Sequence, residues 1–281
     1  MRADLHSHSS ASDGTRPPAE VIARAAGAGL DAIALTDHDT VAGIAEAAAA
    51  LPPGLALISG MELSCRRDGH SVHLLAYLFD PEHEDLAAET RAIRQSRVER
   101  ARAMVAKLNE LGVPVTWEQV TALAGDGVIG RPHIARAMIA AGVVSSIDEA
   151  FTPEWIGPGG RAHVRRRALD PAGAIALVQS AGGVTVLAHP HAVTRGWMVP
   201  DDLISELAHA GLDGVEVDHP DHDAAQRDEL LTVARRLGLA ATGGSDDHGE
   251  LTGDRIGCEA TGQDDLAALL ARATGTPVIT R

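Results

Sequence analysis

Short apolar runs alternate along the chain with longer, alanine-rich stretches of helical periodicity. The short runs have the length and composition of buried strands, and they predict extended segments at 3–6, 31–36, 55–63, 71–79, 183–188, 213–217 and 239–243. The stretches between them predict helices at 17–28, 40–50, 171–180, 203–210, 224–237 and 264–273. Repeated strand–helix units of this kind indicate a parallel α/β barrel.

The alternation is interrupted in the middle of the chain. Residues 86–110 have apolar positions at helical spacing and predict one long helix, and residues 114–160 predict short helical pieces joined by segments rich in proline and glycine. We interpret 86–160 as a small helical insertion that caps the substrate, and 1–85 together with 161–281 as the barrel. A tight turn at 67–70 indicates that the strand after it runs antiparallel to the strand before it.

Composition narrows the class of protein. Hydrophobic residues make up 45% of the 281 positions and aromatic residues only 2%, so we expect an aliphatic, alanine-rich core. The net charge of −15 argues against a protein that coats long duplex nucleic acid. Neither a signal peptide nor a membrane-spanning run is expected, so we expect a cytoplasmic protein, and Cys65 and Cys258 are expected to be small buried residues in a reducing compartment. The oligomeric state has no signature in the sequence.

Imidazoles and carboxylates gather where the predicted strands end. The set consists of His6, His8, Asp13, His38, Glu62, His73, His189, Asp246 and His248. Strand ends of a parallel barrel open on one face, and an antiparallel fourth strand brings His73 to that face as well. One structural zinc site uses four ligands, whereas this set can hold two or three ions with a bridging carboxylate. Any single histidine is more often structural, but the joint pattern predicts a metal centre.

The motifs that carry these residues have a known counterpart. They read Asp4-Leu-His-Ser-His8, Thr36-Asp-His-Asp39, Ala188-His-Pro190 and Gly244-Ser-Asp-Asp-His248, with Glu62 and His73 between them. In this order they resemble the motifs of the PHP (polymerase and histidinol phosphatase) family. The resemblance spans the chain except the insertion, and it implies a distorted (β/α)7 barrel with a trinuclear metal centre.

The resemblance also implies how the ligands divide among the ions. One ion would take His6, His8, Glu62 and Asp246; a second would share Glu62 and take His73 and His189; a third would take Asp13, His38 and His248. Many relatives have a histidine at the position of Asp13, so we expect the third ion to be bound more weakly or to be a different metal. Donors of this kind accept manganese, iron and zinc, and we expect Mn²⁺ before Fe²⁺ or Zn²⁺.

Within the family, the insertion makes the chain most similar to the branch of the 3′,5′-nucleoside bisphosphate phosphatases and the ribonuclease AM-type enzymes, which trim RNA from its 5′ end. The resemblance implies a phosphoesterase that converts a nucleoside 3′,5′-bisphosphate, such as adenosine 3′,5′-bisphosphate, to AMP and phosphate through attack by a water held between the metals. The alternatives are an exoribonuclease on short 5′-phosphorylated RNA, a histidinol-phosphate phosphatase and a non-catalytic, metal-binding regulatory module. An amidohydrolase with a carboxylated lysine is excluded, because the only lysine, Lys107, lies in the insertion.

Further residues are candidates for the remaining steps. The leaving group needs a proton, and His191 and His219, just beyond the fifth and sixth strands, are candidate donors, with a supporting or surface role as the alternative. Asp37 and Asp39 flank His38 and are expected to orient it. In the insertion and its return, Arg131, His133, Arg161 and His163 are expected to hold the distal phosphate of a small anionic nucleotide or a short RNA.

Overall fold

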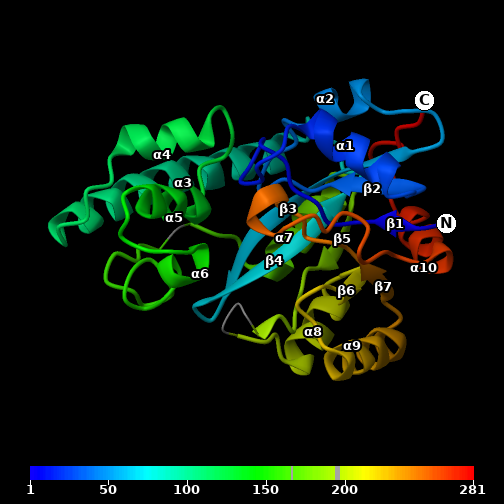
Figure 1. Cartoon of the computed structure of the whole chain (residues 1–281). Coiled ribbons are helices and arrows are strands. Elements are labelled where there is room, and N and C mark those ends of the chain that lie inside the picture. The colour runs from blue at the N-terminus through cyan, green and yellow to red at the C-terminus, as the bar shows by residue number, and fades with distance from the viewer. Residues whose placement is uncertain (166, 194–196) are drawn as a thin grey trace.

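The computed structural model of the chain describes residues 1–165, 167–193 and 197–281. Within these residues, seven strands form one sheet in chain order, which curls into a nearly closed barrel with helices around it (Figure 1). The strands are β1 (Ala3–Asp4), β2 (Ala32–Leu35), β3 (Ala56–Arg67), β4 (His70–Tyr77), β5 (Val184–Leu187), β6 (Gly214–Asp218) and β7 (Ala240–Gly243). The predicted barrel with a helical insertion is confirmed.

Strand directions follow the prediction. β4 pairs antiparallel with both β3 and β5, and the other neighbouring strands are parallel. The first and last strands are tied together near the mouth, where Leu5 N donates to Gly243 O (3.2 Å) and Asp246 N donates to His6 O (2.8 Å). The beginning of β4 therefore lies at the same mouth as the ends of its parallel neighbours.

Among the described residues, six α-helices cover the barrel: α1 (Pro18–Gly27), α2 (Ile44–Ala49), α7 (Pro171–Ser180), α8 (Asp201–His209), α9 (Ala224–Leu237) and α10 (Gln263–Leu270). A short turn of 3₁₀-helix, η2 (Gly249–Leu251), follows β7. The helix ends are encoded locally. In α9, Asp223 and Gln226 form a reciprocal capping box, and Gly238 ends the helix with a left-handed φ of 67°. Helix α2 begins later than the predicted 40–50, because Asp39 has a φ of 55° and the Thr40 hydroxyl accepts from Ala42 N in a turn.

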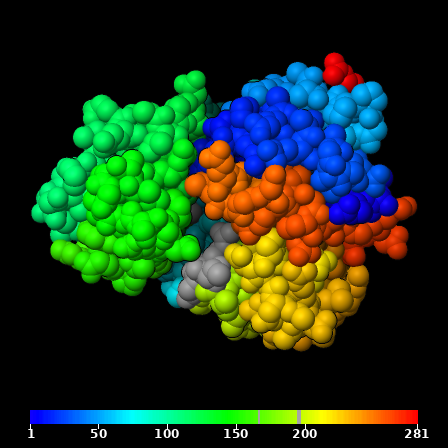
Figure 2. Space-filling view, viewed as in Figure 1, coloured from blue at the N-terminus to red at the C-terminus, as the bar shows by residue number. Residues whose placement is uncertain are grey.

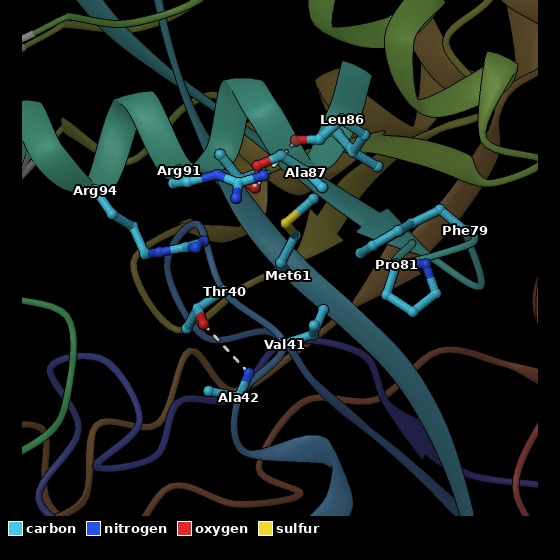
Figure 3. A pocket seen from close by; sticks show the side chains of 11 residues that line it. Thr40, Val41, Ala42, Met61, Phe79, Pro81, Leu86, Ala87, Arg91 and Arg94 are labelled. Atoms are coloured by element: carbon cyan, nitrogen blue, oxygen red, sulfur yellow. Dashed lines mark hydrogen bonds between the residues drawn. The ribbon is translucent and has the colours of Figure 1, made fainter. Parts of the chain in front are cut away.

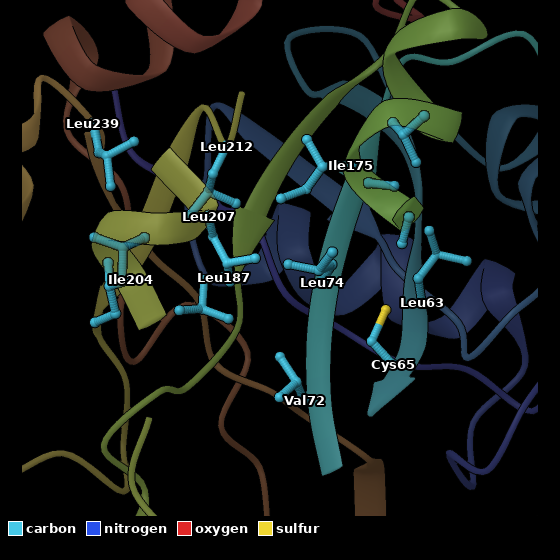
Figure 4. Close-up of a cluster of buried hydrophobic side chains, with 14 of the residues drawn as sticks. Leu63, Cys65, Val72, Leu74, Ile175, Leu187, Ile204, Leu207, Leu212 and Leu239 are labelled. Atoms are coloured by element: carbon cyan, nitrogen blue, oxygen red, sulfur yellow. The ribbon is translucent and has the colours of Figure 1, made fainter. Parts of the chain in front are cut away.

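The barrel has an apolar layer on each side of the sheet. Strand side chains alternate between the faces, so Leu63, Leu74 and Leu187 point outward against Ile175 and Leu207 of the covering helices (Figure 4). The inner layer is narrower and uses many alanines. Cys65 is buried in the outer layer as expected. The prediction is wrong for Cys258, which is exposed because it lies in a surface turn whose N–H bonds to Arg255 O.

The middle of the chain forms a separate helical unit, seen in green in Figure 1. Its helices are α3 (Glu84–Glu110), α4 (Trp117–Ala124), α5 (Arg131–Ala140) and α6 (Ile147–Ala150). They bury their own apolar cluster, which includes Met104, Leu108, Val120, Ile134 and Met138. Figure 2 shows the molecular surface hollowed between this unit and the orange and yellow segments of the barrel. Among the described residues, no helix is both long and apolar enough to cross a membrane.

Candidate metal centre

The first two histidines lie side by side at the end of β1. The Nε2 atoms of His6 and His8 are 3.1 Å apart, and both side chains are buried. His6 Nδ1 lies 3.0 Å from Glu216 Oε1, so Nδ1 carries the proton and donates to this carboxylate. The Nε2 lone pair of His6 is therefore free to bind a cation.

Two carboxylates complete this group of donors. Asp246 Oδ1 lies 3.3 Å from the Nε2 atoms of both His6 and His8, and Glu62 Oε2 lies 3.5 and 3.2 Å from the same two atoms. Four donors about 2.0–2.1 Å from a tetrahedrally coordinated ion would be separated from one another by roughly 3.3 Å. These separations match that geometry, so the group fits a divalent cation.

Glu62 lies between two groups of histidines. Its Oε2 faces His6, His8 and the Nδ1 of His38, which is 3.0 Å away. Its Oε1 faces His73 Nδ1 at 2.5 Å and His189 Nε2 at 3.0 Å. A carboxylate that offers one oxygen to each of two donor groups has the arrangement needed to bridge two ions.

A further group forms around Asp13. Asp13 Oδ2 lies 3.7 Å from His38 Nε2, and Asp13 Oδ1 lies 3.5 Å from His248 Nε2. The ring of His248 stacks on that of His8 with centroids 4.1 Å apart. The donor atoms of His8, Asp13, His38 and His248 all lie within 4.8 Å of one another.

Charge dominates the titration of these groups in the absence of metal. Burial lowers the pKa of His8, but hydrogen bonds with Asp246 and Glu62 outweigh burial and raise it to about 10. Burial raises the pKa of Glu62, but the charges of the surrounding histidines hold it well below its usual range. The centre thus stabilises bound positive charge, which a divalent cation can supply in place of protons.

The hydrogen bonds of these residues test whether they fit a metal ion, because their donor atoms point toward a common centre instead of bonding in pairs. The buried Nδ1 of His38 makes no hydrogen bond with any described residue, although Glu62 Oε2 lies 3.0 Å away. A buried polar atom without a partner is costly, and a cation between the two atoms removes that cost. The mixed imidazole and carboxylate set suits borderline and hard divalent ions.

Glu216 is a site residue that the sequence interpretation missed. It lies fully buried within β6, where its Oε1 accepts from His6 Nδ1 and its Oε2 accepts from His189 N at 2.7 Å. One carboxylate therefore orients two members of the centre. A signal was available, because a carboxylate inside the apolar run Gly214-Val-Glu-Val217 is costly to bury unless it has partners.

Asp37 and Asp39 occupy two different networks. Asp37 accepts from Ser9 N, Ser9 Oγ and Ser12 Oγ at 2.8, 2.7 and 2.6 Å, so it orders the loop that leads to Asp13. Among the described residues, the Asp37 carboxylate makes no hydrogen bond or ion pair with the His38 ring. The Asp39 carboxylate accepts from Ser64 N and Oγ at 2.8 Å and from Arg97 Nε at 2.8 Å. Both aspartates thus hold the segments around His38.

The two candidate proton donors lie in different surroundings. His219 is buried with its Nε2 3.4 Å from Asp246 Oδ2, and its Nδ1 accepts from Asp221 N at 3.0 Å. That bond assigns the proton to Nε2, which faces the centre. His191 is also buried, with its Nδ1 3.7 Å from Glu229 Oε2 on α9 and its N donating to His222 Nε2.

The insertion approaches the centre at Asp13. Val128 N donates to Ala11 O at 3.0 Å, and a Cβ placed on Gly130 would lie 3.3 Å from Asp13 Oδ2. His133 lies in the first turn of α5, where its Nδ1 accepts from Gly130 N at 3.0 Å, and it is buried. The start of α5 therefore faces the third group of donors.

Basic side chains gather around His163. Burial lowers the pKa of His163, and the charges of four arginines lower it further: Arg131, Arg100, Arg66 and Arg165. The Arg131 guanidinium also lies 4.6 Å above the centre of the Phe151 ring. Arg161 is half exposed and pairs with Glu154 instead. The predicted residues Arg131 and His163 are thus brought together with Arg66 and Arg100, which the sequence interpretation missed.

Comparison with known proteins identifies related chains. A family model for the PHP domain matches residues 4–115. A 5′-3′ exoribonuclease of Haemophilus influenzae is 36% identical over 87% of this chain and 89% of its own length, and a 3′,5′-nucleoside bisphosphate phosphatase of Chromobacterium violaceum is 35% identical over 90% and 89%. A crystal structure of a protein assigned as a metal-dependent phosphoesterase, from Bifidobacterium adolescentis, superposes with a TM-score of 0.90 at 35% identity, over 97% of this chain and 96% of that one.

Proposed function

The chain belongs to the PHP domain family of phosphoesterases, and we propose that it removes the 3′-phosphate from nucleoside 3′,5′-bisphosphates such as adenosine 3′,5′-bisphosphate. The observation that carries the choice of substrate is the arginine cluster around His163. The insertion contributes Arg100 and Arg131 to this cluster, and the same insertion reaches Asp13. A substrate with two phosphates suits this arrangement: one phosphate on the metal centre and the other on the arginines.

His6, His8, Glu62 and Asp246 would hold one ion, Glu62, His73 and His189 a second, and Asp13, His38 and His248 a third. We propose manganese, with iron or zinc as alternatives. Bound ions would neutralise the charge on the phosphate and activate a water for attack on phosphorus. The surrounding chain supplies positioning: Glu216 orients His6 and His189, and Asp37 and Asp39 hold the segments around His38.

The insertion, residues 86–160, would act as a cap over the barrel formed by 1–85 and 161–281. Arg131, His133 and His163 would bind the distal phosphate together with Arg66 and Arg100. Arg161 would contribute less, because its guanidinium already pairs with Glu154. The Phe151 ring lies beneath the Arg131 guanidinium and helps to hold it in position.

Of the two histidines considered as proton donors, His219 is better placed to protonate the leaving oxygen. Its protonated Nε2 lies beside Asp246, a ligand of the proposed first ion. His191 Nδ1 lies near Glu229 of α9 instead, and its backbone N–H donates to His222 Nε2. Replacement of His219 with asparagine would therefore lower kcat at constant KM, whereas the same change at His191 would alter neither.

A 5′-to-3′ exoribonuclease on short 5′-phosphorylated RNA is the second candidate. A relative with this name is 36% identical to the chain over 89% of its own length. Both substrates present a phosphoester beside a second phosphate, so the same groups could bind either one.

The test compares three substrates with the manganese-loaded protein. We expect release of phosphate from adenosine 3′,5′-bisphosphate to exceed both nucleotide release from a 5′-phosphorylated oligoribonucleotide and phosphate release from histidinol phosphate. Faster release of nucleotides from the oligoribonucleotide would establish the second candidate instead. Turnover of none of the three would overturn the proposal.

The arginine cluster is tested with Arg131→Ala. The variant should raise KM for the bisphosphate at least tenfold and leave KM for an aryl phosphate, which has no second phosphate, nearly unchanged. Arg102→Ala is the matched control, since it removes an arginine on α3 that packs on Trp117. Equal losses on both substrates would contradict a distal phosphate site.

A further inference from the structure

A second polar pocket lies behind the metal centre, on the outer side of the barrel wall. It has a volume of about 350 Å³ and lies between the start of α3 and the loop after β2 (Figure 3). Its apolar walls include the buried side chains of Met61, Phe79 and Leu86. Side chains of a strand alternate between its faces, so Met61 lines this pocket while its neighbour Glu62 faces the metal centre.

Two arginines and one hydroxyl provide donors at this pocket. Arg91 and Arg94 extend from α3 toward the loop that carries Thr40, as Figure 3 shows. Among the described residues, none accepts a hydrogen bond from the Arg91 guanidinium. Arg94 donates to the backbone oxygen of Asp39 at 2.7 Å, and the Thr40 hydroxyl accepts from Ala42 N, which leaves the hydroxyl proton free to donate.

The two guanidinium groups lie close enough for their like charges to interact. Burial lowers the pKa of Arg94, and the charge of Arg91 lowers it further, while Asp39 opposes both. Arginine does not lose its proton at physiological pH, so both positive charges remain, and the Asp39 carboxylate that offsets them is already bonded to Arg97. The chain as a whole carries a charge of −15, so this paired positive charge is local.

We propose that this pocket binds a small organic dianion, with a phosphate or phosphonate head on Arg91, Arg94 and Thr40 and an apolar body against Met61, Phe79 and Leu86. Two positive charges match a dianion, and three donors match its oxygens. A volume of about 350 Å³ is at the lower end of the range for small-molecule sites. The proposal does not depend on which substrate the metal centre hydrolyses.

A ligand bound in the pocket would change the geometry of the metal centre. Arg94 holds the backbone of Asp39, the residue next to His38, and the floor of the pocket is the strand that carries Glu62. A ligand that draws Arg94 away from Asp39 O would shift His38 relative to Glu62. By linkage, the ligand and the metal then change each other's affinity by the same factor.

The experiment is equilibrium dialysis of radiolabelled phenylphosphonate against the manganese-loaded full chain. We expect the wild type to bind one more molecule per chain than either Arg91→Ala, which removes an exposed donor, or Ala87→Trp, which fills the pocket without a change of charge. Arg102→Ala on the same helix is the control and should bind as the wild type does. Equal binding by the wild type and both variants would overturn the site.

The coupling is measured with a manganese titration in the presence and absence of phenylphosphonate. The probe should change the manganese dissociation constant of the wild type at least threefold more than it changes that of Ala87→Trp. Because the pocket is filled in Ala87→Trp, that variant measures any direct effect of the probe on the metal centre. The same change in both proteins would show that the pocket, if filled, does not act on the metal centre, and would overturn this part of the proposal.

Discussion

At the scale of single residues, the buried carboxylate of Glu216 orients two histidines of the candidate metal centre. Its two oxygens accept from His6 Nδ1 and from His189 N, so two members of the metal centre take their orientation from one side chain in β6. A charged acceptor also increases the basicity of the imidazole that donates to it. We therefore expect this residue to affect metal affinity although it is not one of the predicted ligands.

Glu216→Gln should weaken manganese binding about 10- to 100-fold, because the side chain keeps its shape but loses its charge and one of its two acceptors. Electron paramagnetic resonance of free manganese measures the change. Glu206→Gln is the control, since Glu206 pairs with Arg67 at the surface. An unchanged manganese affinity in Glu216→Gln would contradict the role of Glu216 in orienting the two histidines.

Metal binding should release protons at neutral pH. The pKa of His8 in the metal-free protein is raised to about 10, so His8 carries a proton that the metal must displace. A raised pKa stabilises the metal-free fold fully below the ordinary value of about 6.5, and this stabilisation is lost as the pH rises through about 10. Manganese affinity should therefore increase with pH between 6 and 8 on the order of tenfold per unit for each proton displaced.

Calorimetric titrations in buffers of different ionisation enthalpy measure this release. At least one proton per chain should appear in the buffer at pH 7. Binding enthalpies that do not depend on the buffer would contradict the prediction.

At the scale of elements, α3 joins the insertion to the barrel through a buried ion pair. Arg97 Nε donates to Asp39 Oδ2 at 2.8 Å, and Arg97 Nη2 donates to Ser64 Oγ at 2.7 Å. All three side chains are buried. The helix is thereby fixed to the loop that follows β2 and to the end of β3, which carry His38 and Glu62.

Arg97→Met should lower the free energy of unfolding by about 3 kcal/mol, because the variant leaves the Asp39 carboxylate buried without its charged partner. Urea denaturation measures the loss. Arg102→Ala on the same helix removes a contact with Trp117 and should cost about 1 kcal/mol or less.

The double variant Arg97→Met with Asp39→Asn should recover part of the loss, because the unpaired charge is then absent. If Arg97→Met alone were as stable as the wild type, the ion pair between Arg97 and Asp39 would contribute nothing to the attachment of α3.

At the scale of the whole molecule, the metal centre joins segments from both ends of the chain. Its candidate donors come from the loops after β1, β2, β5 and β7 and from β3 and β4, so bound ions would link six of the seven strands. Ions that bind the folded chain and not the unfolded one stabilise it by mass action. Metal content should therefore control the stability of the barrel.

Removal of manganese with a chelator should lower the melting temperature. Each ion present at 100 times its dissociation constant adds about 2.7 kcal/mol, which corresponds to roughly 5–10 °C in a chain of this size. Differential scanning calorimetry with and without manganese measures the shift. A melting temperature that does not depend on metal would contradict a centre that joins the two ends of the barrel.

The features of this fold that could be predicted from the sequence depend on residues that are close together in the chain. Apolar runs marked the strands and alanine-rich periodicity marked the helices, because both depend on neighbouring positions. The antiparallel direction of β4 followed from a turn of a few residues. The late start of α2 was not predictable in this way, because Asp39 is held with a positive φ by Arg97 and Ser64, which lie far from it in the sequence.

The sequence by itself determined the fold class and indicated nine potential metal donors that gather at one mouth of the barrel, since strand spacing and chain order decide both. It did not determine which other groups support them. His6 and Glu216 are 210 positions apart, and Arg66 and Arg100 join Arg131 only when the insertion packs on the barrel. Those contacts, and the pocket behind Glu62, depend on packing between distant segments, which only the tertiary structure decides.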